Sequence, residues 1–411
     1  MIQAPKGTFD VLGKDAMARD GLVAVARRVL EGAGYERIET PIFEATDLFA
    51  RGVGESTDVV QKEMYSFDDG GGRSLTLRPE GTAPVCRAYL EAGMHKRPQP
   101  VKLWYCGQFF RNERPQAGRF RQFWQIGVEA IGSEDPAVDA ECILLLAEVL
   151  ESMNCQGVRL RLSSLGTPAT RTAYRDELQA HLRAHEDALS EEVRGRIDLN
   201  PLRAFDSDHP GTQAVMATAP RLLDALDDAD REHFEAVRAM LDAAGQAYEI
   251  DDTLVRGLDY YTRTVFEFAS DSLGAQSGVG GGGRYDGLME LIGGAPTPGV
   301  GWAAGVERIL LSANPPPTAA PPVDLYVAYD GPDHRVRAFA LSADARRTGH
   351  SARLELGGRS LKGQLKQAAK SGARYVAVVS DEGVLLRDAE SGDQRIVEPN
   401  QVMHHIRQGQ L

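Results

Sequence analysis

Four arginines fall within eleven residues of one aromatic-rich segment of this chain. They are Arg111, Arg114, Arg119 and Arg121, and the neighbouring aromatic residues are Phe109, Phe110, Phe120 and Phe123. The guanidinium group offers a planar fork of donors that matches phosphate oxygens, and an aromatic ring offers a face on which a base can stack. The pattern predicts a nucleotide site carried by strands. An exposed, charged hairpin tip is the alternative that composition leaves open.

Polar side chains within apolar surroundings form a second group of candidates. Glu129 lies in the run Val128-Glu129-Ala130-Ile131. A carboxylate in such a setting is either paired or functional, and the residue pattern does not decide between the two. Tyr260 and Tyr285, considered singly, are more often core aromatics than ligand contacts.

The run Gly278–Gly283 satisfies the spacing Gly-x-Gly-x-x-Gly of dinucleotide-binding turns, so an NAD enzyme has to be considered. That turn belongs at the start of a βαβ unit, whereas these glycines follow several predicted hairpins. We therefore favour a strand whose backbone a ligand approaches closely. The phosphate-binding pattern Gly-x-x-x-x-Gly-Lys-Ser/Thr does not occur in the sequence.

Hairpins are the elements most strongly predicted to carry these residues. Pairs of strands are expected over Glu63–Arg78, over Val101–Arg111 with Phe120–Ile131, and over Leu258–Ala269 with Gln276–Gly283. Successive hairpins favour an antiparallel sheet. Residues 168–240 are rich in Ala, Leu, Arg and Glu, which predicts a helical insertion in the sheet domain.

A proline-rich stretch separates the last part of the chain. Residues 312–322 contain five prolines within eight positions and predict a semi-rigid linker. Beyond it, apolar runs alternate with helical patterns, which predicts a small α/β domain with a largely parallel sheet. Lys362, Lys366 and Lys370 recur at spacing four and should share one helix face. That face is either a nucleic-acid contact or an ordinary solvated surface.

Composition indicates a globular protein of two or three domains. The chain has 411 residues, 46 Lys and Arg against 59 Asp and Glu, and a net charge of −13. Residues 323–411 carry 13 basic against 11 acidic side chains, whereas residues 1–322 carry 33 against 48, so we expect the two parts to meet different partners. No long apolar run or signal-like start is found, and the four cysteines lack metal-pair spacing. We expect a cytoplasmic protein with reduced cysteines.

Three ordered segments resemble the motifs of class II aminoacyl-tRNA synthetases. Gly34–Pro41 resembles motif 1, Phe110–Arg114 resembles motif 2, and Gly299–Ile309 resembles motif 3. Leu254–Thr262 and Gly281–Leu288 are similar to the two segments specific to the histidyl-tRNA synthetase family, and Thr76–Thr82 extends the match. The resemblance covers nearly the whole chain.

The resemblance implies a reaction in two steps. Histidine and ATP would give histidyl-adenylate and pyrophosphate, and the 3′-terminal ribose of tRNA(His) would then take the histidyl group. Arg111 and Arg256 would be catalytic, contacting the α-phosphate and the carboxylate. ATP would also contact Glu113 at the adenine amino group, Phe123 by stacking, Arg121 as a further phosphate contact and Arg308 at the γ-phosphate. Mg²⁺ would neutralise the pyrophosphate.

The resemblance also implies a histidine site and a tRNA surface. The histidine site would comprise Glu80, Thr82, Gln125, Glu129, Arg256, Tyr260, Tyr261 and Tyr285. Within it, Glu129 and Tyr261 would read the two imidazole nitrogens, and Glu80 would lie near the α-ammonium group. The motif 2 turn, with Arg114, Gln116 and Arg119, would approach the acceptor end of tRNA. Lys362, Lys366 and Lys370 would face the anticodon stem. No metal ligands of the protein are assigned.

The implied fold is α+β, with an antiparallel class II sheet flanked by helices, a helical insertion and a C-terminal α/β anticodon-binding domain. The expected division is 1–167 and 241–311 for the catalytic domain, 168–240 for the insertion, 312–322 for the linker and 323–411 for the anticodon-binding domain. The motif 1 resemblance implies a homodimer. The alternative is a non-catalytic paralogue that regulates ATP phosphoribosyltransferase, which typically lacks the last domain and the catalytic residues retained here.

Overall fold

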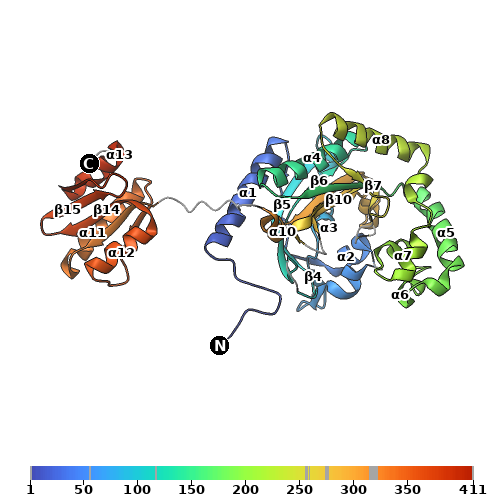
Figure 1. Cartoon of the computed structure of the whole chain (residues 1–411), viewed down its shortest axis with the longest axis horizontal. Helices are drawn as coiled ribbons and strands as arrows, with labels where there is room; N and C mark the ends of the chain where they lie inside the picture. The colour runs from blue at the N-terminus through green and yellow to red at the C-terminus, as the bar shows by residue number, and fades with distance from the viewer. Residues whose placement is uncertain are drawn as a thin grey trace. The chain divides into compact units, whose positions relative to one another are not determined.

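The structure is a computed structural model that describes residues 2–54, 57–115, 118–254, 258, 260–273, 277–313 and 323–409. The chain divides into two compact units, Met1–Thr318 and Ala319–Leu411 (Figure 1). The predicted linker at 312–322 falls largely on residues outside the described ranges.

The first unit is built on one large sheet. Its strands lie in the order β1 (Glu36–Arg37), β5 (Val101–Phe110), β6 (Gln122–Ile131), β11 (Gly299–Gly305), β10 (Gly278–Arg284), β9 (Thr262–Ser270), β7 (Val158–Ser164) and β8 (Glu249–Ile250). The central strands are antiparallel, whereas β1 and β8 pair in parallel at the two edges. A second, smaller sheet has the order β2 (Phe43–Ala45), β4 (Ser74–Leu77) and β3 (Tyr65–Asp68).

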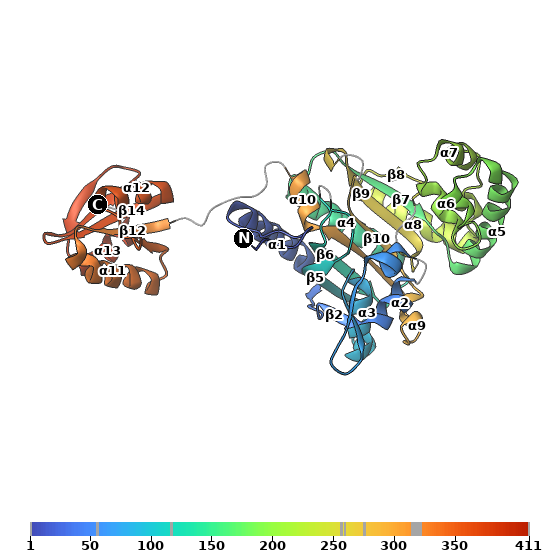
Figure 2. The same cartoon turned by 90° about the horizontal axis from the view of Figure 1, so that it is seen from below.

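Helices cover both faces of the large sheet. Those of the first unit are α1 (Lys14–Gly32), α2 (Thr46–Val53), α3 (Thr82–Glu91), α4 (Pro136–Ser152), α5 (Pro168–Ala184), α6 (Glu191–Arg194), α7 (Pro210–Met216), α8 (Asp228–Ala243), α9 (Leu288–Leu291) and α10 (Val306–Ser312). One apolar core joins α1, α4 and α8 to one face, and another joins α3 and α9 to the opposite face (Figure 2). Because both faces are covered, β5 and β6 are apolar along most of their length.

Sequence periodicity explains how these helices pack. In α1 the buried residues are Ala18, Leu22, Ala26, Val29 and Leu30, a spacing that places them on one side of the helix. The α4 helix begins at Pro136, and the Asp135 carboxylate accepts a hydrogen bond from the Ala137 amide at 2.9 Å. These helices form the rigid layer behind the strands that carry the site.

Between β7 and β8 the chain leaves the sheet and forms a separate helical lobe. It contains α5, α6, the 3₁₀ turn η4 (Pro201–Asp206) and α7, which share their own apolar core, and α8 leads back to the sheet (Figures 1 and 2). We call these helices the insertion lobe. Two segments of chain connect it to the sheet, one before α5 and one that includes α8.

The second unit is an α/β structure. Its elements are β12 (Val323–Tyr329), α11 (Arg335–Arg347), β13 (Ala352–Leu354), α12 (Leu361–Ser371), β14 (Ala373–Ser380), β15 (Gly383–Asp388), β16 (Gln394–Val397) and α13 (Val402–Gln408). The sheet order is β13-β12-β14-β15-β16, with β13, β12 and β14 parallel and the last two strands antiparallel. The parallel half follows from the two helical crossovers, and the antiparallel half follows from short turns.

The predicted fold class is confirmed, including the antiparallel sheet, the helices inserted between its strands and the α/β unit that follows. The parallel edge strands and the separate small sheet were not predicted. Within the described residues, no helix combines the length and the apolarity that a membrane crossing needs.

Candidate active site

A cavity of about 750 Å³ opens over the centre of the large sheet. Six residues predicted for the site line it: Arg111, Glu113, Arg119, Phe123, Gln125 and Arg308. The backbone of residues 278–281 on β10 forms part of the floor. The predicted nucleotide-site residues of the β5–β6 hairpin and of α10 therefore meet around one space, although nearly two hundred positions separate them in sequence.

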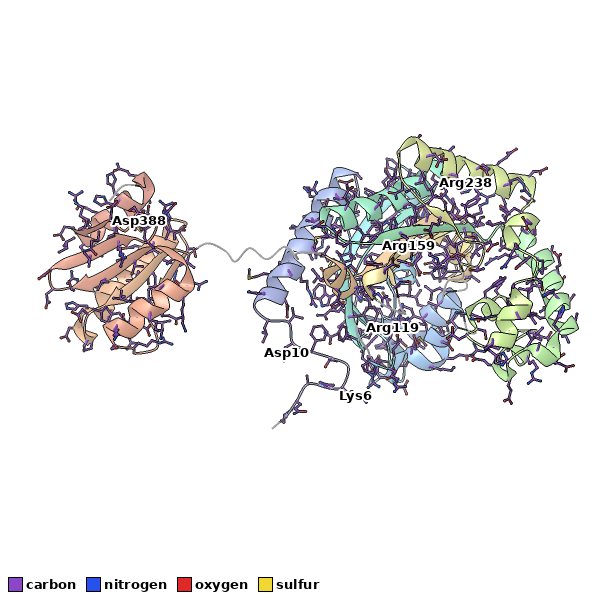
Figure 3. The ribbon with its side chains drawn as sticks, in the orientation of Figure 1. Lys6, Asp10, Arg119, Arg159, Arg238 and Asp388 are labelled. Carbon is purple, nitrogen blue, oxygen red and sulfur yellow. The ribbon has the colours of Figure 1, made fainter. Side chains whose placement is uncertain are left out.

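Arg111 follows directly after β5 and is held in a fixed orientation. Its Nε donates to the Pro79 carbonyl at 2.9 Å, and its guanidinium carbon lies 5.5 Å from the centre of the Phe123 ring. Glu113 lies beside it, with 3.8 Å between Arg111 Nη1 and a Glu113 carboxylate oxygen. Glu113 also pairs with Arg119 at 3.2 Å (Arg119 is labelled in Figure 3). The arginines are thus preoriented before any ligand enters.

Arg308 adds a further positive charge to the cavity wall, near Gly118 and Arg119. It lies on α10, and its Nε donates to the Gly278 carbonyl. Burial and the nearby Arg119 lower its pKa, but an arginine remains protonated at neutral pH. Three guanidinium groups, those of Arg111, Arg119 and Arg308, therefore line one cavity, which suits an anion with several phosphate oxygens.

Next to the cavity lies a buried cluster centred on Glu129. Thr82 donates to Glu129 Oε1 at 2.8 Å, Tyr285 donates to Oε2 at 2.7 Å, and Tyr105 lies 3.4 Å from Oε1. Gly301 on the adjoining strand leaves the room for this carboxylate, because a Cβ there would lie 2.0 Å from Glu129 Oε2. The cluster assembles a carboxylate and three hydroxyls from different elements.

Burial sets the protonation behaviour of this cluster. It raises the pKa of Glu129 to about 8, although hydrogen bonds from Tyr285 and Thr82 act in the opposite direction. Burial also raises the pKa of Tyr285, and the neighbouring Glu129 adds to that effect. At neutral pH the Glu129 side chain is consequently mostly in its acid form.

Glu80 forms the second carboxylate of the cluster. It accepts hydrogen bonds from the Thr82 and Ala83 amides at 2.7 and 2.9 Å, at the start of α3, where the helix dipole favours a negative charge. Burial raises its pKa, while these amides lower it. The Tyr260 hydroxyl lies 3.5 Å from Glu80 Oε2, and the Tyr260 and Tyr261 rings are 4.7 Å apart.

The structure does not place every predicted residue at this centre. Arg256 and Gln116 fall outside the described residues. Arg114 is exposed. Arg121 does not line the cavity. Its Nε donates to the Glu113 carbonyl at 3.3 Å, and its amide donates to the Gly7 carbonyl. Lys362, Lys366 and Lys370 are exposed on α12 in the second unit, opposite the buried residues of that helix.

The residues 278–283 form an internal strand rather than a turn into a helix. β10 pairs with β9 on one side and β11 on the other. A dinucleotide-binding turn requires a strand that leads into a helix N-terminus, so this run does not fit the NAD alternative. At Gly282 a Cβ would lie 1.9 Å from the Gly301 carbonyl, so close strand packing explains a glycine there.

Several residues of the site were not found from the sequence. Tyr105 contacts Glu129, Arg161 and Glu267 line the cavity 3.4 Å apart, and Phe205 of the insertion lobe reaches the cavity wall. Glu267 sits between Phe266 and Phe268, so the signal that singled out Glu129 was present there as well. Phe205 carried no comparable local signal.

Comparison with known proteins identifies the family. The family model described as histidyl-tRNA synthetase matches residues 7–309. A protein of Desulforamulus reducens named histidine–tRNA ligase is 47% identical over 413 residues, which is 98% of this chain and 98% of that protein. The chain belongs to the histidyl-tRNA synthetase family. The family predicted from the motifs is therefore confirmed.

Solved structures of this family agree with the fold. The apo histidyl-tRNA synthetase of S. aureus matches with a TM-score of 0.82 and 34% identity, over 99% of this chain and 100% of that one. A Bacillus halodurans protein described as an ATP phosphoribosyltransferase regulatory subunit/histidyl-tRNA synthetase matches with a TM-score of 0.66 and 20% identity, over 92% of this chain and 98% of that one. The second match bears on the fold alone.

Proposed function

We propose that this chain joins histidine to tRNA(His) by way of histidyl-adenylate. The observation that carries the proposal is the buried Glu129 cluster beside a cavity lined by Arg111 and Arg308, in a member of the histidyl-tRNA synthetase family. A carboxylate with hydroxyls suits an imidazole, and guanidinium groups suit ATP.

In the first step the histidine carboxylate attacks the α-phosphorus of ATP. The nucleophile is already ionised, so no general base is required, and the barrier lies in bringing two anions together. Arg111 and Arg256 hold the α-phosphate and the carboxylate, and Arg308 holds the γ-phosphate. The tether from Arg111 to the Pro79 carbonyl supports this role, because a preoriented donor needs no reorganisation as charge develops.

Glu113 and Phe123 bind the adenine, by hydrogen bonding and by stacking, and Arg121 remains a phosphate candidate. ATP also brings Mg²⁺, which neutralises charge on the pyrophosphate. Mg²⁺ favours phosphate oxygens together with one or two carboxylates, and Glu267 on the cavity wall would supply one of them. Within the described residues no group of three or more acidic, histidine or cysteine side chains forms a ready-made metal site.

Selection of histidine rests on the buried cluster. Glu129 reads one imidazole nitrogen, Tyr261 the other, Glu80 lies near the α-ammonium group, and Tyr260 and Tyr285 form the wall. Thr82 and Gln125 complete the lining. A buried site of this kind rejects amino acids that leave its polar groups unpaired by roughly 10⁴-fold, because each unpaired group loses its solvation without compensation.

In the second step a hydroxyl of the terminal ribose of tRNA(His) attacks the acyl carbon of histidyl-adenylate, which breaks the bond to the phosphate and releases AMP. Arg114, Gln116 and Arg119 of the motif 2 turn approach the acceptor end, and Lys362, Lys366 and Lys370 face the anticodon stem. Residues 323–411 are then the anticodon-binding domain, 168–240 the insertion domain, and 1–167 with 241–311 the catalytic domain. The chain acts as a homodimer in the cytoplasm.

The alternative is the regulatory paralogue of ATP phosphoribosyltransferase. The 47% identity over almost the full length of a histidine–tRNA ligase favours the catalytic function. The arginines at 111 and 308 line the cavity rather than being replaced, and the α/β unit after residue 322 is present.

Amino-acid-dependent exchange of labelled pyrophosphate into ATP tests the function. Each of the twenty amino acids is supplied separately with Mg²⁺. We expect exchange with histidine alone, followed by charging of tRNA(His). Folded protein that exchanges with none of them would refute the proposal and favour the regulatory paralogue.

A further inference from the structure

The segment Tyr260–Arg263 connects the Glu129 cluster to the insertion lobe. Tyr260 and Tyr261 belong to the buried core beside Glu80 and Glu129. The next two residues begin β9, where Arg263 turns toward the root of the lobe. This short segment therefore has the proposed histidine site at one end and the insertion lobe at the other.

Arg263 has an unusual backbone conformation. Its φ is +46°, in the left-handed region that a residue with a Cβ adopts only at a cost. Its amide donates to the Gly166 carbonyl at 2.8 Å, and its carbonyl accepts from the Leu165 amide at 2.7 Å. A conformation of this kind persists only where surrounding contacts impose it, and such positions concentrate at functional sites.

Asp230 on α8 supplies one of those contacts. Its side chain is fully buried, and its Oδ1 accepts from Arg263 Nε at 3.0 Å. Its Oδ2 accepts from the Thr167 amide at 2.7 Å and from the Thr170 hydroxyl at 2.8 Å, both at the start of α5. Burial raises the pKa of Asp230, but these donors outweigh it, so the carboxylate is ionised at neutral pH. One carboxylate thus ties both roots of the lobe to Arg263.

A second tether runs from α5 to the tyrosine pair itself. Arg171 Nη1 donates to the Tyr261 carbonyl at 2.7 Å. At the other side of the segment, the Thr262 hydroxyl lies 3.3 Å from the Asp286 amide, next to Tyr285. The backbone that orients Tyr260 and Tyr261 is therefore held by α5 through Arg171 and by α8 through Asp230.

From these contacts we infer that Asp230, Arg263 and Arg171 are positioning residues that couple the insertion lobe to histidine binding. They fix the backbone at Tyr261 so that the two rings face the Glu129 cluster, and a lobe displaced from its root would release them. The inference rests on the proposed function, since it takes this cluster as the histidine site. Because such coupling is reciprocal, bound histidine must also favour the position of the lobe in which Asp230 and Arg171 make these contacts.

If these residues only stabilised the fold, their substitution would lower the stability of the protein rather than its histidine affinity alone. The positive φ of Arg263 allows a substitution that separates the effect on stability from the effect on histidine binding. Arg263→Gly removes the tether but suits a positive φ, so the relief of backbone strain offsets the entropy that glycine adds to the unfolded chain. Asp230→Asn keeps a carbonyl oxygen for the Thr167 amide and the Thr170 hydroxyl while it removes the charge that Arg263 pairs with. Both variants should therefore remain folded.

The experiment measures histidine affinity by calorimetry in the full-length chain, without ATP. We expect R263G and D230N each to weaken histidine binding about tenfold. The double variant should bind histidine within about twofold of either single variant, because both substitutions break the same tether. The KM for ATP in pyrophosphate exchange should stay within about twofold of wild type. The matched control is Glu235→Gln, which breaks a 2.7 Å pair with Arg238 elsewhere on α8 (Arg238 is labelled in Figure 3).

Wild-type histidine affinity in R263G and D230N would overturn the inference. So would a loss of affinity matched by an equal rise in the KM for ATP, because that pattern reports general disorder of the site. A different result would refute the proposed function, namely a wild-type chain that binds histidine but catalyses no pyrophosphate exchange. Arg263→Lys should recover part of the affinity lost in R263G, as it restores the charge without the planar fork.

Discussion

Replacing Glu129 with glutamine tests the histidine site through its pH dependence. The carboxyl is fully buried and its pKa is raised to about 8. If the carboxylate form accepts the imidazole N–H, the protein must first lose the proton, so only the ionised fraction of molecules is competent to bind. The glutamine side chain has a similar shape, does not titrate and offers a neutral acceptor.

The expected magnitude follows from that pKa. With a pKa of about 8, roughly one molecule in eleven is ionised at pH 7 and ten in eleven at pH 9. The histidine affinity of the wild type should therefore rise about tenfold over this range. A hydrogen bond to a charged group stabilises a complex by about 1 to 2 kcal/mol more than a hydrogen bond between neutral groups. The ionised site should therefore bind histidine about five- to thirtyfold more tightly than a neutral site. The histidine affinity of E129Q should therefore be close to that of wild type at pH 7 and about tenfold lower than that of wild type at pH 9.

The assay is the ratio of the histidine dissociation constants of E129Q and wild type, measured by calorimetry at pH 7, 8 and 9. Ionisation of histidine itself affects both proteins equally and cancels in the ratio. A ratio that is constant across this range, with both proteins folded, would show that Glu129 does not read the imidazole as a carboxylate.

Thermal unfolding gives an independent readout of the same group. The folded pKa lies above the unfolded value of 4.5, so the folded state holds the proton more tightly and stability falls as pH rises from about 4.5 to about 8. At about 1.4 kcal/mol per pKa unit, the effect is on the order of 5 kcal/mol at most. The wild type should lose stability relative to E129Q between pH 5 and pH 8, and unchanged relative stability would contradict the raised pKa.

Three further predictions concern the arginines and the tRNA surface. Arg111→Lys should lower the rate of histidine-dependent pyrophosphate exchange by about 10²-fold, because lysine cannot reproduce the preoriented fork, and a rate within threefold of wild type would exclude the assigned role. Arg256→Ala should likewise abolish most adenylate formation, and near-normal single-turnover formation of adenylate would refute its role. Substituting Lys362, Lys366 and Lys370 together by alanine should raise the KM for tRNA(His) and leave histidine-dependent pyrophosphate exchange unchanged. The salt dependence of this KM should become less steep by about one logarithmic slope unit for each phosphate contact that is lost. An unaltered salt dependence would assign these lysines to an ordinary solvated face.

Much of the scaffold was predictable because its signals are local. The hairpin Val101–Ile131 follows from apolar runs on either side of a polar turn, and the structure forms β5 and β6 there. The lysines of α12 share an exposed side because their spacing matches the helical period. The edge strands β1 and β8 were not predictable in the same way, since each is only two residues long and pairs with a distant strand.

Local patterns in the sequence were enough to predict the family, the fold class and the residue types of the site, because motifs and periodicity involve neighbouring positions. Which side chains meet depends on the tertiary fold. Glu129 finds Thr82, Tyr105 and Tyr285 through strand register and the position of α3, and its raised pKa follows from their joint exclusion of water. The left-handed Arg263 and its bond to Asp230 likewise depend on α8 returning to the sheet. Contacts of this kind join residues far apart in sequence, and no local pattern specifies the distance between them.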